Sequence, residues 1–268
     1  MFKKIALCTI VFSLLIFPVF IKAQAKSETI KPSLSASDDA QALIKDGDDF
    51  YAARDDARNV LKAIDKYKVA LEIDQKNYEA TWRISRAYYF YGTKLSEDDE
   101  DGRKQTFDKG MHWAKIAMKF NNNRVDGHFW LGVNLGSWGE ANGVMKSLSI
   151  RHDLEDTMLK AAKLDEEYEG AGSYRVLGRL KFRLPGIFGG DNDLSIEYLR
   201  KAVKIAPTHT MNYIFLAETL MDEDEYVEAK KLLEKVIAME PDPRWVPEAK
   251  RDKEDAKRLL KEVLEELE

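Results

Sequence analysis

The sequence of 268 residues has a single cysteine, Cys8, which lies in an apolar run near the amino terminus. The rest of the chain therefore offers neither a disulfide framework nor a cysteine-ligated metal site. Only seven prolines and fifteen glycines are present, so few residues interrupt long helices. The four histidines lack the spacing of metal ligands, and no nucleophile is paired with a base. We expect no metal, no cofactor and no enzymatic activity.

The charge is weakly acidic, with 42 basic and 47 acidic residues and a formal net charge of −5. A chain of this charge has no general attraction for nucleic acid or anionic lipid. Hydrophobic residues make up 44% of the sequence, which is enough to bury a core. These values are typical of an ordinary globular protein whose partners are not nucleic acids.

The first residues have the pattern of a secretory signal. Lys3 and Lys4 precede an apolar run at 5–21, and Ala23-Gln24-Ala25 is a small-x-small cleavage pattern. A retained membrane anchor is the alternative, although Pro18 interrupts a run that is short for a membrane span. We expect a signal peptide at 1–25, a flexible tether at 26–37, a helical repeat domain at 38–268 and a periplasmic location.

One short pattern occurs five times in the remaining chain: a small residue, an apolar residue, a polar residue and another apolar residue. The first residues of these segments are separated by 47, 44, 41 and 34 positions, and the last interval equals the period of a tetratricopeptide repeat. The five segments are Ala70-Leu71-Glu72-Ile73, Ala117-Met118-Lys119-Phe120, Ala161-Ala162-Lys163-Leu164, Ala202-Val203-Lys204-Ile205 and Val236-Ile237-Ala238-Met239.

Each unit also contains small residues where two helices would approach closely. Leu131-Gly132 and Leu177-Gly178 fit this role in the first helix of a pair, and Ser195 followed by Leu199 fits it in a second helix. The fold class expected is all-α: an α-solenoid of about five degenerate tetratricopeptide-like helix pairs. The longer early spacings predict insertions between the two helices of a pair. Residues 246–268 predict a helix that caps the last pair.

Arginines and aromatic residues recur on the first helices, which line the concave face of such a solenoid. Arginine binds carboxylates through bidentate hydrogen bonds, and aromatic rings provide apolar walls. The pattern favours a groove for a small anionic molecule or an acidic peptide. The alternative is that the rings pack between repeats and the arginines pair with acidic residues. The candidate ligand-binding residues are Trp82, Arg86, Tyr89, Phe129, Arg175, Arg179 and Phe182.

Residues 184–191, L-P-G-I-F-G-G-D, resemble a phosphate-binding loop only superficially, because the Lys-Ser/Thr step is missing. We interpret the segment as a turn in which Asp191 or Asp193 caps the following helix. Ile187 and Phe188 would then be exposed apolar groups that could contact a partner.

Two stretches together resemble a known family. Residues 131–139 read L-G-V-N-L-G-S-W-G, and residues 175–191 contain R-x-x-G-R followed by L-P-G-x-x-G-G-D. With the signal-like amino terminus and the degenerate repeats, the chain resembles the TatT family of periplasmic components of TRAP transporters. The resemblance covers roughly residues 40–245. It implies cryptic tetratricopeptide repeats, a periplasmic solute-binding protein as partner, an organic acid as ligand and a homo-oligomer.

These observations support two functional hypotheses. The first is a non-catalytic component of a TRAP-type solute uptake system, which docks the solute-binding protein and holds or passes a small anionic ligand. The second is a generic tetratricopeptide-repeat scaffold for protein–protein interaction in the cell envelope. Neither assigns a catalytic role to any residue.

Overall fold

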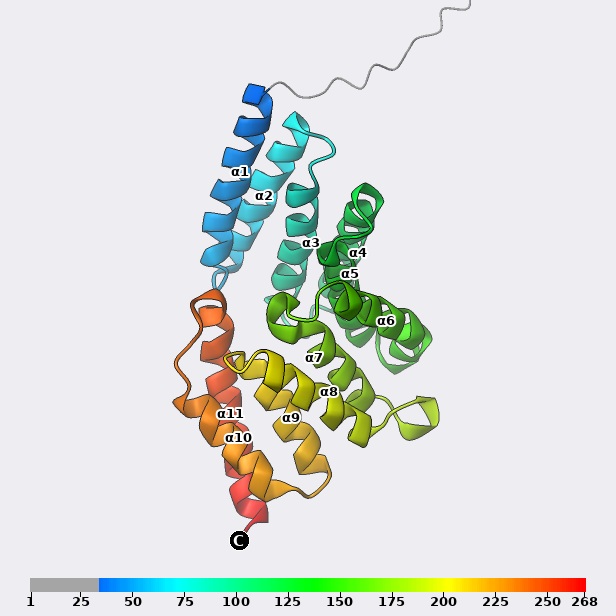
Figure 1. Cartoon of the computed structure of the whole chain (residues 1–268), viewed down its shortest axis with the longest axis vertical. Helices are drawn as coiled ribbons and strands as arrows, with labels where there is room; N and C mark the ends of the chain where they lie inside the picture. Colours follow the sequence, from blue (N-terminus) through cyan, green and yellow to red (C-terminus); the bar gives the residue numbers. More distant parts are fainter. Residues whose placement is uncertain (1–33) are drawn as a thin grey trace, which may run out of the picture. The chain divides into compact units, whose positions relative to one another are not determined.

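The computed structural model describes residues 34–268, and the helices in this part follow one another without a strand between them (Figure 1). The predicted signal peptide and residues 26–33 of the predicted tether lie outside the described residues. The α-helices are α1 Leu34–Ala52, α2 Ala57–Ile73, α3 Tyr78–Gly92, α4 Glu100–Phe120, α5 Val125–Asn142, α6 Val144–Leu164, α7 Tyr168–Arg183, α8 Asn192–Ile205, α9 Thr210–Asp222, α10 Tyr226–Ala238 and α11 Val246–Glu266. Two short 3-10 helices, η1 Gly186–Phe188 and η2 Pro243–Trp245, precede α8 and α11.

Ten of these helices form five antiparallel pairs, α1/α2, α3/α4, α5/α6, α7/α8 and α9/α10, and each pair packs against the next. Helix α11 packs against α9 and α10 and covers the last pair. The predicted all-α solenoid of five pairs with a capping helix is therefore confirmed. Helix α1 begins at Leu34, so residues 34–37 of the predicted tether belong to a helix.

The repeated sequence pattern marks the ends of the second helices. Its first residue is completely buried in every pair: Ala70, Ala117, Ala161, Ala202 and Val236 are 0% exposed. A small side chain at this point allows the following pair to approach closely. The recurrence found in the sequence therefore reflects one packing position that is repeated along the solenoid.

Glycines allow the two helices of a pair to touch. A Cβ atom on Gly178 of α7 would lie 2.5 Å from Leu199 Cγ and 3.1 Å from the Ser195 carbonyl oxygen, both on α8. A Cβ atom on Gly132 of α5 would lie 2.5 Å from Met158 Cε on α6. The predicted close approaches at these glycines are thus present.

The extra residues of the early units mostly lengthen helices instead of forming loops. Helices α4 and α6 each have 21 residues, and a single residue, Gly143 with φ of 83°, separates α5 from α6. Part of the acidic run at 97–101 starts α4, where Asp99 accepts a hydrogen bond from the Gly102 N–H. Negative charge in the first turn suits the positive end of the helix dipole.

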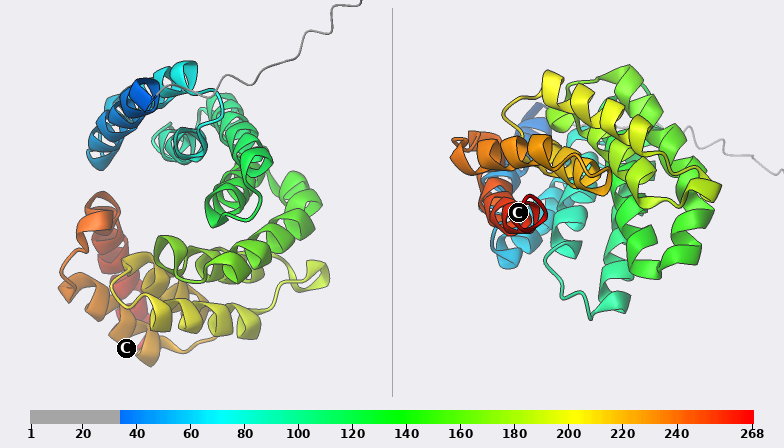
Figure 2. Two further views of the ribbon diagram at one scale, coloured as in Figure 1. Left: turned by 45° about the horizontal axis from the view of Figure 1, so that its top comes forward. Right: turned by 90° about the horizontal axis from the view of Figure 1, so that it is seen from below.

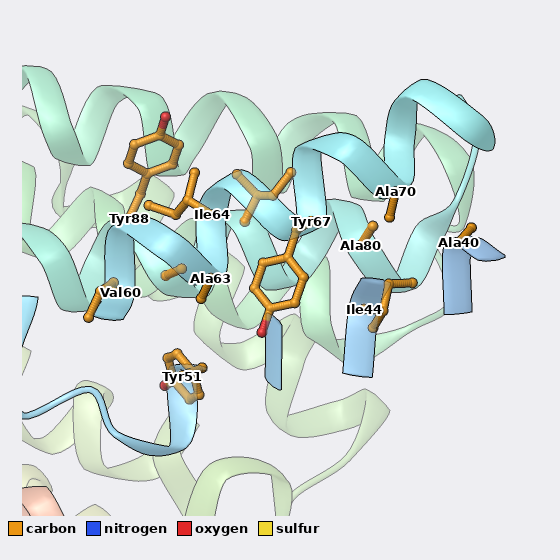
Figure 3. Close-up of a cluster of buried hydrophobic side chains, with 12 residues drawn as sticks. Ala40, Ile44, Tyr51, Val60, Ala63, Ile64, Tyr67, Ala70, Ala80 and Tyr88 are labelled. Atoms are coloured by element: carbon orange, nitrogen blue, oxygen red, sulfur yellow. The ribbon is translucent and has the colours of Figure 1, made fainter. Parts of the chain in front are cut away.

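The apolar residues of the described helices form three clusters. The first joins α1, α2 and α3, where Ile44 and Tyr67 are completely buried (Figure 3). The Tyr67 hydroxyl donates to Asp48 Oδ1 at 2.8 Å. The second cluster joins α3 to α8 around Phe129 and Met158, and the third joins α8 to α11 around Leu216 and Leu233. Stability is therefore built from neighbouring helices, as expected for a repeat protein.

The helix pairs wind so that the loop after α1 meets the start of α11 (Figure 2). The Arg54 side chain donates to the Glu248 carboxylate across 194 positions of sequence. No helix between Leu34 and Glu266 combines the length and the hydrophobicity that a membrane span requires.

Candidate functional site

Two adjoining cavities lie on the inner face of the helix pairs. Cavity A has a volume of about 170 Å³ and cavity B a volume of about 410 Å³. Three residues, Phe90, Glu169 and Trp245, line both cavities. Cavity A is lined mainly by the first helices of successive pairs, as predicted for the concave face. The start of α11 and η2 complete its wall.

Cavity A has apolar and aromatic walls. They come mainly from α5, α7 and α9, with Phe90 of α3 and Trp245 of η2. The residues of the three helices are Phe129, Trp130, Val133, Val176, Met211 and Phe215. Polar groups enter this surface at a few points, and they include Tyr89, Glu169, Arg175, His209, Glu248 and Arg251. Apolar walls with a few fixed polar groups are typical of sites for small molecules or peptide side chains.

Arg175 is held in cavity A by uncharged oxygens. Its Nη1 donates to the Gly170 carbonyl at 3.1 Å and to Asn212 Oδ1 at 2.9 Å, and its Nη2 donates to the Glu169 carbonyl at 3.2 Å. Within residues 34–268, no carboxylate lies within ion-pair distance of this guanidinium. Burial lowers the pKa of Arg175, although nearby Tyr89 and Glu169 act in the opposite direction.

The two carbonyls that receive Arg175 point inward because the backbone turns left-handed at the start of α7. Glu169, Gly170 and Ala171 have φ values of 49°, 65° and 58°. Such values are uncommon outside glycine, so Glu169 and Ala171 store strain of about 1–3 kcal/mol each. Strained backbone of this kind concentrates at functional sites, because the surrounding structure must hold it in place.

His209, at the start of α9, closes the same corner of cavity A. It is 6% exposed, and its ring centroid lies 4.4 Å from that of Trp245. Its Nδ1 has no hydrogen-bond partner among the described residues. Burial lowers the pKa of His209 well below its usual value, and the positive charge of Arg175 adds to this effect. The imidazole is therefore neutral near pH 7.

Cavity B is more polar. The Arg86 guanidinium stacks on the Tyr51 ring at 3.7 Å, and its Nη2 donates to Asp48 Oδ1 at 3.2 Å. The same carboxylate accepts a hydrogen bond from Arg83 at 3.0 Å. The Nε atom of Arg86 is buried without a partner among the described residues.

Basic side chains outnumber acidic ones in the lining of the two cavities, although the chain as a whole is acidic. The basic residues that line the two cavities are Arg54, Arg83, Arg86, Lys94, Arg175, Arg244 and Arg251, and the acidic ones are Asp48, Glu169 and Glu248. Low-dielectric walls strengthen the potential of such charges. Three of these arginines, Arg83, Arg244 and Arg251, are paired with Glu79, Asp242 and Asp252.

The predicted ligand-binding residues divide into two groups. Tyr89, Phe129 and Arg175 line cavity A, and Arg86 lines cavity B. The other three lie outside both cavities. The contacts of these three residues and of Arg86 fit the alternative stated above, in which the rings pack between repeats and the arginines pair with acidic residues.

Trp82 donates its indole N–H to Glu79 at 2.9 Å and packs under Arg86. Arg179 donates to Glu218 Oε2 at 2.7 Å and stacks on Phe215. Phe182 lies beside Arg179, with the guanidinium carbon 5.2 Å from its ring centroid. These residues support the walls of the cavities from behind.

Sequence reasoning missed the residues that the carboxy-terminal segment contributes. Trp245, Glu248 and Arg251 follow the last repeat, so the repeat pattern assigns them to a cap and not to the inner face. The left-handed turn at Glu169 was also missed. Only Gly170 within the G-A-G stretch signals it, since glutamate and alanine rarely adopt this conformation.

The fold and the inner cavities define an α-solenoid of the tetratricopeptide-repeat class. A family model described as "Tetratricopeptide repeat" matches residues 189–246. A second model, described as "Regulator of microtubule dynamics protein 1-3", matches residues 43–186. Because this match spans more than half of the chain, the protein belongs to that family. A sequence search of curated proteins gives no match.

Solved structures share the fold at low sequence identity. TTC0263, a tetratricopeptide-repeat protein of Thermus thermophilus, is 15% identical with a TM-score of 0.61, covering 84% of this chain and 98% of its own. PilF of Pseudomonas aeruginosa is 14% identical with a TM-score of 0.56, covering 85% of this chain and 93% of its own. These similarities establish the solenoid and leave the ligand open.

Proposed function

We propose that this protein is a non-catalytic scaffold that binds an anionic group of a partner, or a small organic acid, on its inner face. The observation that carries the proposal is the position of Arg175. Its partly buried guanidinium lines an aromatic cavity and contacts only uncharged oxygens of the described residues. A ligand carboxylate would supply the missing countercharge, and charge-assisted hydrogen bonds of this kind are among the strongest in proteins.

We propose further that the partner is the solute-binding protein of a TRAP-type uptake system, with the chain located in the periplasm. The signal-like pattern at 1–25 and the motifs at 131–139 and 175–191 support this assignment. The Arg175 of the second motif is the residue that enters cavity A.

A pull-down from periplasmic extract tests the partner. The wild-type chain should recover a TRAP solute-binding protein, and Arg175→Gln should reduce the recovery at least tenfold. Arg200→Gln is the matched control, because Arg200 is exposed and pairs with Glu228 on the outer helices. If the wild-type chain recovers no solute-binding protein, the TRAP assignment is wrong.

Calorimetric titration with succinate and with benzoate tests the small-ligand part. At least one acid should bind, and Arg175→Gln should weaken its binding by about tenfold or more, since hydrogen bonds to charged groups contribute about 1.5–3 kcal/mol. Binding of neither acid would restrict the proposal to protein partners.

A generic scaffold for protein–protein interaction in the cell envelope is the second candidate. It is favoured by the exposed apolar tip before α8, where Ile187 is 87% exposed. The family description names regulators of microtubule dynamics, and a surface for protein partners is compatible with that description. Recovery of other envelope proteins, lost in Ile187→Ser and retained in Arg175→Gln, would favour this candidate.

A further inference from the structure

One buried side chain joins the two ends of the described helical unit. Arg54, in the loop after α1, donates from Nε to Glu248 Oε1 at 2.7 Å and from Nη2 to Glu248 Oε2 at 2.6 Å. Nη2 also donates to the Arg244 carbonyl at 2.7 Å. We call Arg54, Glu248 and the Arg244 carbonyl the clasp.

The Arg54 side chain of the clasp is held in place by its burial and by two aromatic rings. Arg54 is 5% exposed, and its guanidinium carbon lies 4.8 Å from the Tyr51 ring centroid and 5.3 Å from that of Phe90. A two-pronged arginine–carboxylate pair is directional as well as strong. The contact is therefore more than a chance surface ion pair, which would contribute little.

Within residues 34–268, no apolar cluster includes residues from both sides of the clasp. The cluster that contains α1 and α2 residues ends within α3 and α4, and the cluster that contains α11 residues ends at α8. Helix α11 packs against α9 and α10, while α1 packs against α2 and α3. The two ends are thus connected indirectly through all the intervening helix pairs. The clasp provides most of the direct contact between them.

Both cavities take walls from either side of this junction. Cavity B is lined by Tyr51 and Arg54 on one side and by Arg244 and Trp245 on the other. Cavity A is lined by Phe90 on the side of the first pairs and by Trp245 and Glu248 on the other side. Separation of the clasp would remove one wall from each cavity.

We propose that the clasp is a gate that closes the helical unit around the two cavities and controls entry to them. Each helix pair contacts only its neighbours, so small rotations add up along the solenoid and move its ends apart. Removing one partner of this buried ion pair leaves the other charge uncompensated, so a change at either residue should separate the two ends. That the gate admits a ligand rests on the proposed function, whereas the opening itself does not.

Distance measurements between spin labels test the gate without any ligand. In the full chain carrying Cys8→Ser, labels at Asp65→Cys on α2 and Lys250→Cys on α11 report the separation of the two ends. Both positions are exposed and lie outside the clasp. Arg54→Ala and Glu248→Gln should each lengthen and broaden the distance distribution, and the double variant should add little to either.

Arg58→Ala is the matched control, because Arg58 lies close to Arg54 in sequence and forms an exposed ion pair with Asp56. It should leave the distances unchanged. Circular dichroism verifies that each variant keeps its helices, and Glu248→Gln, which preserves shape, remains informative if Arg54→Ala fails to fold. Distance distributions equal to the parent in folded Arg54→Ala or Glu248→Gln would overturn the proposal. If the clasp variants open but the wild-type protein binds neither succinate, benzoate nor a protein partner, the gate is retained and the proposed function is wrong.

Discussion

At the scale of the residue, the polar groups around the cavities differ in how their burial is compensated. Asp48 receives three donors, from Tyr67, Arg83 and Arg86. His209, in contrast, is enclosed by Trp245 and Gly170 and has an Nδ1 atom without a partner among the described residues. A buried titratable group without a compensating partner, such as His209, makes the stability of the protein depend on pH.

His209 should lower the stability of the protein in mild acid. Its pKa is lowered in the folded state, so below about pH 6.5 the unfolded chain takes up a proton that the folded chain does not. Stability is then present above this pH and decreases as the pH falls. Between pH 7 and pH 5 the free energy of unfolding should decrease by about 1–2 kcal/mol more in the wild type than in His209→Gln. Urea unfolding at both pH values measures this, and equal losses in the two proteins would contradict it.

At the scale of the element, the close contact between α7 and α8 depends on Gly178. A methyl group there would lie 2.5 Å from Leu199 Cγ and 3.1 Å from a backbone oxygen, which moves less readily than a side chain. Gly178→Ala should therefore destabilise the protein by about 1–3 kcal/mol, as overpacking does.

Gly136 in α5 provides the matched comparison. A Cβ atom there would lie 3.5 Å from Leu154 Cδ2, an ordinary contact. Gly136→Ala should be neutral or stabilising by up to about 1 kcal/mol, because alanine is the better helix former. Urea unfolding measures the change in the free energy of unfolding for both variants. Similar changes in the two would refute the role assigned to Gly178.

The elements could be predicted because their signals are local. The buried positions from Ala70 to Val236 repeat at short, countable intervals, and Asp191 precedes α8 as a capping residue should, accepting a hydrogen bond from the Leu194 N–H at 2.9 Å. The cavities could be predicted only in part. Tyr89 and Arg175 follow the helical period, whereas Trp245 and Glu248 reach the site through the winding of the whole solenoid, which no short segment encodes.

At the scale of the whole molecule, the part of the chain that the structure describes has three successive apolar clusters instead of one central core. In such a chain, stability is approximately a sum of local terms and contacts between neighbours. Damage at one end should therefore remain near that end.

Ile44→Ala tests this locality. Ile44 is 0% exposed in the first cluster, and its truncation should cost about 2–5 kcal/mol. Native-state hydrogen exchange should show lower protection in α1 to α3 and nearly unchanged protection in α9 to α11. Val69→Ala, at a position 41% exposed, serves as the control. A uniform loss of protection along the chain would indicate a single cooperative unit.

The contact between Arg54 and Glu248 also has a consequence for synthesis on the ribosome. Neighbouring helices can pair soon after they emerge, because their partners are close in sequence. Arg54 must wait for 194 further residues before its carboxylate partner exists. During that interval its guanidinium remains in water and the inner face stays accessible. Helix α11, which carries Glu248, is synthesised after all five helix pairs and therefore completes the enclosure.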